Sequence, residues 1–348
     1  MDISNFDFDL PKSLIASRPT SPRSSSKLLF YNYSKIQDLH FLDLPDILNN
    51  NDLLVFNNTK VLPALLYGYI EYIQKTKIFK RKFEFLLVNK INNDDWFSLC
   101  KPLKKIETGN KIFFSNCLSA QIIKKDINGV ILRFEYSGKF TDNINKLGLM
   151  PIPPYIRKIR NSDIFDKKDY QSIFSEKLGS IASPTASLHF DDLLLYNLRK
   201  KGVNFCFVTL HIGIGTFSSM RTKNIFDHKM HSEYGEINLE TSEIINNSLK
   251  QGGRIIPVGT TSLRILETAT IKNKKIQAFS GYTNIFITPG YKFKIISGLI
   301  TNFHLPKSSL FVLVASLLGL QNAKDIYSHA IRNKYRFYSY GDGSIFLK

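Results

Sequence analysis

Residues 203–217 read VNFCFVTLHIGIGTF. The apolar, β-branched and aromatic side chains of residues 203–210 predict a buried strand. The chain then turns at His211, and Gly213 and Gly215 follow, where glycine lets backbone N–H groups approach a ligand closely. A buried strand that runs into a polar turn is typical of an α/β domain, in which ligands bind at the carboxyl ends of strands. A tight structural turn with a hydrogen-bonded histidine would give the same pattern.

Further strands and helices alternate on both sides of this stretch. Residues 52–56 (DLLVF) and 254–258 (RIIPV) predict two more buried strands. Helices are expected at residues 191–200, 239–250, 262–270, 309–318 and 323–335, with Thr241 or Ser242 as the cap of the second. The alternation predicts an α/β domain with mainly parallel strands.

The middle of the chain has a different pattern. Short alternating segments, separated by Asn- and Gly-containing turns, occur at residues 82–88, 96–100, 111–114, 121–125 and 130–136. Short strands separated by such turns predict a small antiparallel sandwich or barrel. Residues 150–155 (MPIPPY) form a rigid connector, because proline disfavours both helix interiors and central strands. We therefore expect an α/β fold: a large α/β catalytic domain from residues 1–65 and 151–348, with a small antiparallel β-barrel domain at 66–150 inserted.

The composition is strongly basic. The 348 residues contain 47 Lys and Arg against 29 Asp and Glu, a formal net charge of +18. This excess indicates a polyanionic partner such as nucleic acid, although an AT-rich genome also raises the lysine content. Cys100, Cys117 and Cys206 lack paired spacing, which argues against a disulfide framework or a metal knuckle and for a reducing compartment.

No segment has the pattern of a membrane or export signal. Residues 1–9 are acidic and have no apolar core, and the longest apolar stretch, 310–320, is too short to span a bilayer. We expect a cytoplasmic protein with no membrane partner.

Ionisable side chains crowd into residues 227–234 (DHKMHSEY). On a strand, one face would carry Asp227, Lys229, His231 and Glu233. Such crowding separates pKa values and assigns acid and base roles. No thiolate or further His–carboxylate set lies nearby, so we expect no metal site. The alternative is a solvated loop with surface ion pairs.

Residues 258–264 (VGTTSLR) join a strand to a helix. The hydroxyls of Thr260, Thr261 and Ser262 are expected to cap this helix, and its free N–H groups favour an anion. Arg264 would add a bidentate contact to a carboxylate or phosphate. Simple capping, with Arg264 in solvent, is the alternative.

Other polar segments have the same character. Residues 183–191 (SPTASLHFD) and 302–306 (NFHLP) are turns with histidines, which are commonly structural groups when they stand beside apolar residues. Residues 332–342 interleave cations with aromatics, a pattern that suits contact with bases and phosphates or, equally, a helix end packed into the core.

Together these motifs resemble, in type and in order, the motifs of one known protein family. In chain order they are 56–64 (FNNTKVLPA), 150–156 (MPIPPYI), 184–190 (PTASLHF), 209–217 (TLHIGIGTF), 227–234 (DHKMHSEY), 259–264 (GTTSLR), 301–306 (TNFHLP) and 335–342 (YRFYSYGD). Over essentially its whole length the chain resembles the S-adenosylmethionine:tRNA ribosyltransferase-isomerase family of queuosine biosynthesis. It departs from the family pattern at Leu65, Leu178 and Ser187, where Arg, Pro and Gly are usual.

The resemblance implies an α/β domain, a smaller β-barrel domain and a reaction. The ribosyl group of S-adenosylmethionine moves to 7-aminomethyl-7-deazaguanine at the wobble position of a tRNA. Epoxyqueuosine-tRNA forms, and adenine and methionine are released. S-adenosylmethionine is consumed as the donor, no permanently bound cofactor is expected, and the protein is expected to act as a monomer. The alternatives are a tRNA-binding protein that has lost catalysis and another S-adenosylmethionine-dependent RNA-modifying enzyme, such as a methyltransferase.

This chemistry suggests roles for the polar residues. The sulfonium acidifies the ribose C5′ hydrogens, and His211 is the first candidate base. His231 or Glu233 would protonate the departing adenine. Glu233 or Asp227 would offset the sulfonium charge, and Arg264 would bind the methionine carboxylate. Further candidates for substrate binding are Asn57, Asn58, Thr59, Thr185, His189, Gly213, Gly215, Thr216, Thr260, Thr261, Ser262, Asn302 and His304. Candidate RNA contacts are Lys101, Lys104, Arg157, Lys158, Arg160 and Arg336.

Overall fold

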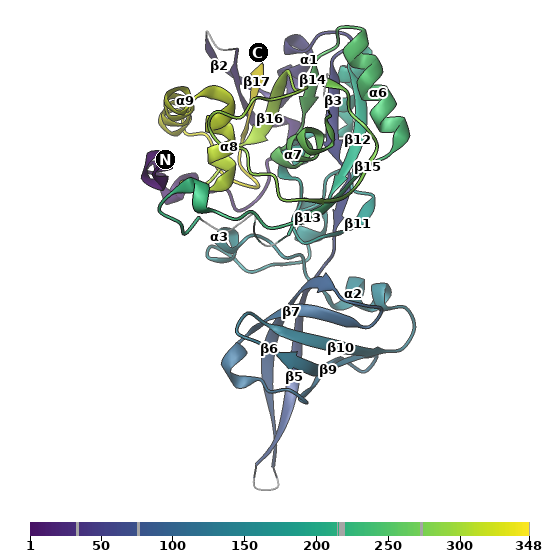
Figure 1. Ribbon diagram of the computed structural model, residues 1–348. Helices are drawn as coiled ribbons and strands as arrows, with labels where there is room; N and C mark the ends of the chain where they lie inside the picture. The colour runs from purple at the N-terminus through teal and green to yellow at the C-terminus, as the bar shows by residue number, and fades with distance from the viewer. Residues whose placement is uncertain (33–34, 75–76, 214, 216–219, 272–273, 348) are drawn as a thin grey trace. The chain divides into compact units, whose positions relative to one another are not determined.

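The chain divides into two compact units. The computed structural model describes residues 1–348 except 33–34, 75–76, 214, 216–219, 272–273 and 348 (Figure 1). The first unit comprises Met1–Lys60, Pro153–Asn161 and Asp169–Lys348, and the second comprises Val61–Ile152 and Ser162–Lys168. The barrel domain expected at residues 66–150 thus lies within the second unit, which also takes in a short segment after the proline-rich connector.

Two sheets build the first unit. One has the order β14-β3-β12-β13-β15, with bounds Ile255–Pro257, Leu53–Asn57, Asn204–Leu210, Glu233–Ile237 and Phe279–Thr283. The other has the order β16-β17-β1-β2, with bounds Gly298–Asn302, Gly343–Leu347, Lys27–Tyr31 and Ile36–His40. A parallel bridge between Val258 and Ile300 links the two sheets. A short pair, β4 (Thr59–Val61) and β11 (Lys177–Ser180), lies beyond the end of β3.

Strand β3 is buried on both faces. Leu53 and Val55 belong to one hydrophobic cluster, whereas Leu54 and Phe56 belong to another, as the alternation of side chains along a strand requires. The helices described in this unit are α1 (Leu44–Ile47), α3 (Pro154–Arg157), α5 (Asp192–Lys200), α6 (Leu239–Lys250), α7 (Thr260–Ala269), α8 (Ser309–Leu318) and α9 (Leu320–Arg332). Helices α1 and α5 contribute to the cluster that holds Leu54 and Phe56, and α6 and α7 contribute to the one that holds Leu53 and Val55. In Figure 1, α6 and α7 flank β12, and α8 and α9 lie near β16. The α/β class expected from the sequence is confirmed.

The expectation of mainly parallel strands is wrong. β14, β3 and β12 are parallel, but β13 and β15 continue the sheet antiparallel, and the second sheet has one parallel and two antiparallel pairs. A parallel return needs a long crossover, usually helical. The described part of residues 211–232 contains no α-helix that could serve as such a crossover, and β13 returns antiparallel.

Two helix caps also differ from the expectation. Asn238, not Thr241 or Ser242, caps α6, because its side chain accepts a hydrogen bond of 2.8 Å from the Thr241 N–H. Helix α7 begins after Gly259, whose φ of 93° suits glycine, and no side chain caps it. The first-turn N–H groups of α7 are therefore not covered by a side-chain cap.

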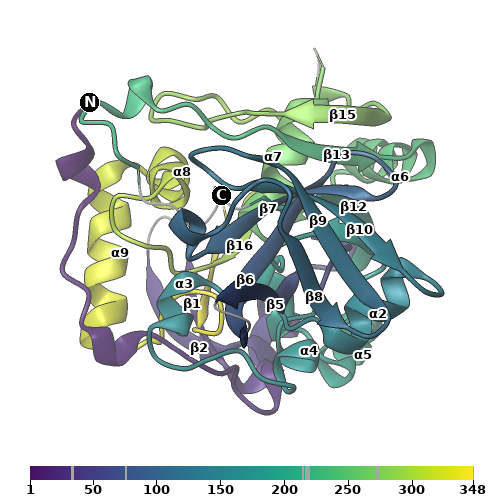
Figure 2. The same ribbon diagram turned by 90° about the horizontal axis from the view of Figure 1, so that it is seen from below.

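The second unit is a closed antiparallel barrel, as expected. Its strand order is β10-β7-β6-β5-β8-β9 (Figure 2). The bounds are Val130–Tyr136, Asp95–Lys101, Lys77–Lys90, Leu65–Gln74, Lys111–Ser115 and Leu118–Lys125. Helix α2 (Phe140–Leu147) follows the barrel strands, and α4 (Asp166–Asp169) lies at the unit boundary. Phe83, Phe85 and Leu87 alternate inward from β6 and fill the interior.

No single helix among the described residues combines the length and the apolar composition needed to cross a bilayer. The bent pair Ser309–Leu318 and Leu320–Arg332, at 113°, passes the same test only when the two helices are taken together.

Candidate functional site

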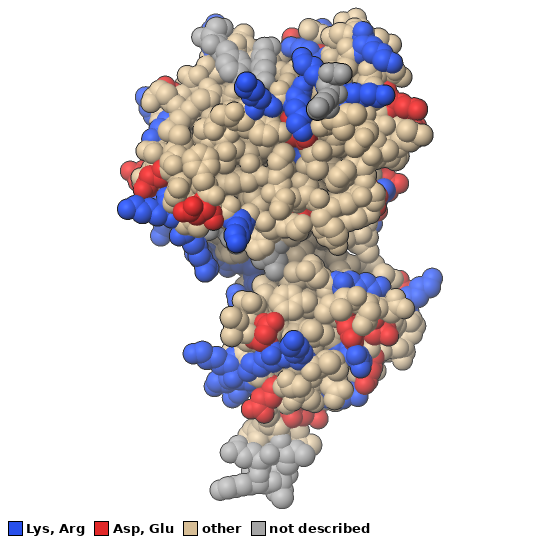
Figure 3. Space-filling view, in the orientation of Figure 1, with Lys and Arg blue, Asp and Glu red and all other residues tan. Residues whose placement is uncertain are grey.

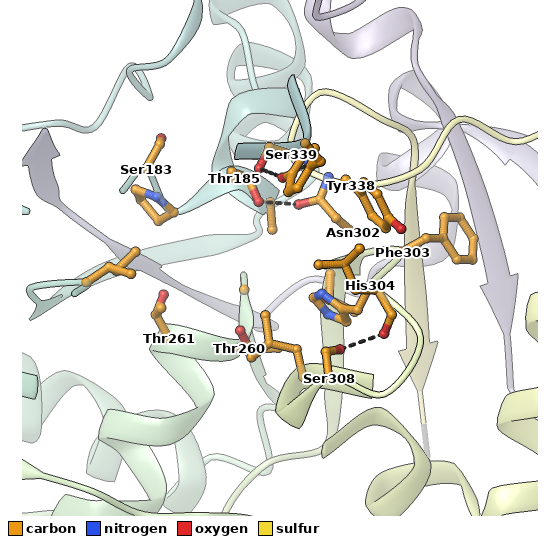
Figure 4. A pocket seen from close by; sticks show the side chains of 18 residues that line it. Ser183, Thr185, Thr260, Thr261, Asn302, Phe303, His304, Ser308, Tyr338 and Ser339 are labelled. Carbon is orange, nitrogen blue, oxygen red and sulfur yellow. Dashed lines mark hydrogen bonds between the residues drawn. The ribbon is translucent and has the colours of Figure 1, made fainter. Parts of the chain in front are cut away.

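A pocket lies where parallel strands of the first unit end. It has about 630 Å³ of empty space, part of it open to solvent. Its walls come from Ile212 after β12, Gly259 to Thr261 after β14, and Asn302 at the end of β16 (Figure 4). Five candidate residues from the sequence line it: Thr185, Thr260, Thr261, Asn302 and His304. This position is the usual ligand site of a sheet with parallel strands.

Asn57, at the end of β3, connects the strands beside the pocket. Its Nδ2 donates to the Leu210 carbonyl (2.9 Å) and to the Thr261 hydroxyl (3.2 Å). Its Oδ1 accepts from the N–H groups of Leu210 and Thr59, both at 3.1 Å. These bonds use both donors and both acceptor positions of the amide. Asn57 therefore connects the end of β3 to the end of β12 and to the first turn of α7.

Asn58 and Ser262 are likewise bonded within the protein. Asn58 donates to the Glu176 carboxylate (3.0 Å) and accepts from the Thr209 hydroxyl (2.7 Å). The Ser262 hydroxyl donates to the Val258 carbonyl (3.0 Å), and its side chain is fully buried. The geometry favours a structural role for both residues.

His211 follows β12 and is half-buried. Its Nδ1 lies 2.8 Å from the Thr59 hydroxyl. Burial is the main cause that lowers its pKa below the usual 6.5; the Glu236 carboxylate opposes this shift and the Lys177 ammonium reinforces it. The imidazole is therefore neutral at pH 7, with one ring nitrogen held by Thr59 and the other able to accept a proton.

Gly179, which sequence reasoning missed, makes room for the His211 ring. Its φ is +156°, and a Cβ there would lie 2.7 Å from His211 Cε1 and 2.9 Å from both ring nitrogens. Lys177 and Glu236, joined by an ion pair of 2.7 Å, were also missed. Charges alternate along many exposed strands, so no sequence signal distinguished this pair.

Gly179→Ala is expected to displace the His211 ring. On the expectation that His211 is the general base, kcat should fall about 100-fold, because a shift of about 1 Å in a catalytic group can cost that much. Gly281→Ala is the matched control, since a Cβ there meets only an ordinary contact of 3.5 Å with Phe279. Steady-state kinetics of both variants, with circular dichroism to confirm folding, make the comparison. Wild-type kcat in Gly179→Ala would show that the ring position does not matter for turnover.

Glu233 and Arg264 form a buried ion pair, each side chain 5% exposed. The Glu233 carboxylate also accepts the Gly213 N–H at 2.9 Å, and Arg264 Nε donates to the Ile285 carbonyl at 3.3 Å. Among the described residues, Arg264 Nη2 has no hydrogen-bond partner. The expected solvent-exposed or ligand-bound Arg264 is thus engaged by a carboxylate from β13.

The glycine turn and the segment 227–234 meet in the structure. The His231 ring packs on Gly215, where a Cβ would fall 2.1 Å from His231 Cδ2. The strand on which Asp227, His231 and Glu233 would share a face does not form: β13 begins only at Glu233, and Asp227 is exposed in a 3-10 turn. Thr216, another candidate in the glycine turn, lies outside the described residues.

The two other candidate histidines are neutral. Burial lowers the pKa of His189 to about 3, and the nearby Arg336 and Arg23 cations add to the shift. Burial also lowers the pKa of His304 to about 3, and its Nε2 lies 2.9 Å from the Thr301 hydroxyl. Both rings therefore act as neutral hydrogen-bonding groups at pH 7.

Several pocket residues were quoted within motifs but not singled out. These are Ser183, Thr301, Tyr338 and Ser339, whereas Ser308, which also lines the pocket, lay outside every quoted motif. The motifs indicated a binding site in these segments. A small hydroxyl side chain does not by itself reveal whether it faces a pocket, so the sequence could not single these residues out.

The candidate RNA contacts differ in exposure. Lys101 and Lys104 in the second unit and Lys158 in the first are exposed, whereas Arg157 is half-buried. Arg160 donates to the Ser17 carbonyl at 3.0 Å. Arg336 donates to the Arg18 carbonyl at 3.3 Å and to the Thr20 hydroxyl, and lies 3.5 Å from the Asp342 carboxylate. In Figure 3 the visible face of the barrel unit carries several Lys and Arg side chains, with Asp and Glu among them.

No group of three or more His, Cys, Asp or Glu side chains in the described part of the chain could hold a metal ion.

The chain is similar to known proteins over nearly its full length. A family model described as a queuosine biosynthesis protein matches residues 3–346. Proteins named S-adenosylmethionine:tRNA ribosyltransferase-isomerase from Ruegeria pomeroyi and Staphylococcus haemolyticus are 44% and 43% identical to it. The first alignment covers 100% of this chain and 99% of the relative, and the second covers 100% of both. A crystal structure of S-adenosylmethionine tRNA ribosyltransferase from Thermotoga maritima has a TM-score of 0.55 and 30% identity, covering 99% of this chain and 100% of that one.

Proposed function

The chain belongs to the queuosine biosynthesis protein family, and we propose on that basis that it is an S-adenosylmethionine:tRNA ribosyltransferase-isomerase. It transfers and isomerises the ribosyl group of S-adenosylmethionine onto 7-aminomethyl-7-deazaguanine in tRNA. Epoxyqueuosine-tRNA, adenine and methionine are the products. The proposal extends to a cytoplasmic monomer without a permanently bound cofactor.

One observation of the structure carries this proposal beyond family membership. Motifs far apart in the sequence converge at the strand ends of the first unit, where residues 183–186, 259–261 and 301–305 line one pocket. His211 stands next to Ile212, which lines the same pocket. A neutral imidazole one residue from the pocket wall can serve as the base that proton abstraction from a bound donor requires.

His211 acts as the general base. The Thr59 hydroxyl orients the ring by accepting from Nδ1–H, which leaves Nε2 to take a proton from C5′ of the donor. The adjacent sulfonium stabilises the carbanion that forms. The resulting imidazolium is stabilised by the Glu236 carboxylate, whose effect on the His211 pKa is upward.

His231 protonates the departing adenine. Of the two candidate acids, Glu233 is buried against the Arg264 guanidinium, whereas His231 is exposed beside the glycine turn. The Glu233 carboxylate is held by the Arg264 guanidinium and the Gly213 N–H, so it is not free to turn toward a leaving group. Glu233 and Arg264 instead hold Gly213 in place.

The reaction is tested by incubating the protein with S-adenosylmethionine and tRNA that carries the 7-aminomethyl-7-deazaguanine base. Mass spectrometry should show adenine and methionine released in equal amounts, with a matching mass gain on the tRNA. Binding of the tRNA without adenine release would indicate a protein that has lost catalysis. Release of S-adenosylhomocysteine would indicate a methyltransferase.

Binding of tRNA should weaken steeply with salt. Exposed Lys101 and Lys104 are proposed phosphate contacts, and each such contact contributes about −0.7 to −0.9 to the slope of log K against log salt. Lys101→Ala with Lys104→Ala should make the slope shallower by about 1 to 2. Filter binding from low to high salt measures it, and the double variant Lys200→Ala with Lys250→Ala, at exposed positions on α5 and α6, is the charge-matched control. A flat salt response of the wild-type protein would contradict phosphate-dominated binding.

A further inference from the structure

The hydroxyl of Thr185 is the end of a chain of hydrogen bonds that starts in the interior of the first unit. Thr185 opens the 3-10 turn Thr185–His189, is half-buried and lines the pocket. The chain runs through Ser26, His189 and Asn302, and each of its bonds is between 2.7 and 3.0 Å long. The direction of every proton in it can be deduced.

The inner end fixes the tautomer of His189. The Ser26 hydroxyl donates its one proton to the Arg23 carbonyl at 2.8 Å, because a carbonyl can only accept. Ser26 Oγ must then accept from His189 Nδ1 at 2.7 Å. The imidazole is 5% exposed, stacks on Phe41 at 4.0 Å and is neutral, so its single proton lies on Nδ1.

The outer end fixes the role of Thr185. Since His189 Nε2 carries no proton, it accepts from the Asn302 amide Nδ2 at 3.0 Å. This bond orients the amide so that Asn302 Oδ1 faces Thr185, and Oδ1 accepts the Thr185 hydroxyl proton at 2.8 Å (Figure 4). The Thr185 hydroxyl has no proton left, and its oxygen is a pure acceptor at the pocket wall.

The facing wall of the pocket supplies donors. Thr260 and Thr261 begin helix α7, whose first-turn N–H groups have no side-chain cap. Ser183, 4% exposed, also lines the pocket, and its hydroxyl has no hydrogen-bond partner among the described residues. A helix N-terminus with a spare hydroxyl favours a carboxylate.

We propose that this pocket binds the amino-acid end of the donor, with Thr185 Oγ1 accepting from the α-ammonium and the α7 N-terminus with Ser183 holding the α-carboxylate. This assignment rests on the proposed function, which makes S-adenosylmethionine the donor. Among the described residues that line the pocket there is no Lys, Arg, Asp or Glu, so the pocket suits a zwitterion of zero net charge. Adenine offers an amino group but no anion for the helix N-terminus, and Arg264 is engaged by Glu233.

The test pairs two ligands with two variants. Isothermal titration calorimetry measures the affinity for S-adenosylmethionine and for the analogue in which hydrogen replaces the α-ammonium. Thr185→Val should weaken the binding of S-adenosylmethionine about 10- to 100-fold, because the variant loses a hydrogen bond to the charged α-ammonium. It should leave the binding of the analogue unchanged, because the analogue has no ammonium group to make that bond. Thr185→Ser keeps the hydroxyl and should bind both ligands like the wild type.

Equal weakening of both ligands by Thr185→Val, or weakening of neither, overturns the proposal. A further experiment uses the products as competitors of S-adenosylmethionine binding. Thr185→Val should reduce competition by L-methionine and leave competition by adenine unchanged. The reverse result would place adenine in this pocket. None of these measurements needs turnover, so they are independent of the adenine-release assay that tests the proposed function.

Ser26 acts through this chain as a positioning residue. Ser26→Ala removes the group that selects the His189 tautomer and should weaken donor binding about 2- to 10-fold, with analogue binding unchanged. A merely structural defect would weaken both ligands alike.

Discussion

His211→Gln is expected to lower kcat by about 10²- to 10⁴-fold, the usual contribution of a general base. Glutamine preserves much of the side-chain volume and keeps a hydrogen-bond donor for the Thr59 hydroxyl, but it cannot take the C5′ proton. Single-turnover adenine release on modified tRNA measures the loss. His329→Gln is the matched control, since His329 lies on α9 and contacts the exposed Asp38 carboxylate.

The pH profile of the wild-type protein provides a second readout of the same group. A base works when deprotonated, and burial lowers the pKa of His211 below 6.5. We therefore expect kcat/KM to fall as His211 gains a proton, with the midpoint of this acidic limb below the pH of 6.5 that an ordinary histidine would give. Full turnover in His211→Gln, or an acidic limb that persists in that variant, would contradict the assignment of His211 as base.

Arg264→Met is expected to lower the free energy of unfolding of the first unit by about 3–5 kcal/mol, since removing one partner leaves a buried charge uncompensated. The Glu233 carboxylate is 5% exposed and would remain beside Gly213 without the guanidinium. Methionine has a similar volume, so the loss reports the charge rather than a cavity. Differential scanning calorimetry or urea unfolding of the full chain measures it.

Two further variants separate the ion pair from other effects. Adding Glu233→Gln to Arg264→Met should restore most of the lost stability, because no buried charge is then left alone. Lys307→Met breaks the exposed ion pair with Asp7 and should change the free energy of unfolding by about 1 kcal/mol or less. Equal losses in Lys307→Met and Arg264→Met would contradict a special role for the buried pair.

Local patterns predicted the elements that hold the site. Residues 53–56 are all apolar, and residues 203–210 are apolar except for Asn204 and Thr209, because β3 and β12 are inner strands of their sheet. The polar residues that follow them lie at strand ends. Helices α5 and α8 have the expected positions. The barrel was recognisable because its strands alternate and are separated by turn residues.

Long-range pairings were not predictable from these patterns. Nothing around Arg264 in the sequence indicates that Glu233 reaches it from β13, because the partner depends on how the sheet packs on α7. The cap of α7 was assigned to hydroxyls, whereas Gly259 fills that place through its backbone conformation. Likewise Gly179 and Ser26 matter through the rings they contact, His211 and His189, and those contacts exist only in the folded chain.

The most direct test of the central claim follows the fate of two parts of the donor. S-adenosylmethionine labelled with ¹⁴C in the ribose and, in a separate reaction, in the methyl group is incubated with the protein and modified tRNA. Ribosyl transfer predicts that the ribose label appears in the tRNA in proportion to adenine released, while the methyl label leaves with methionine. Methyl label in the tRNA, with the ribose label left on the nucleoside product, would contradict the account.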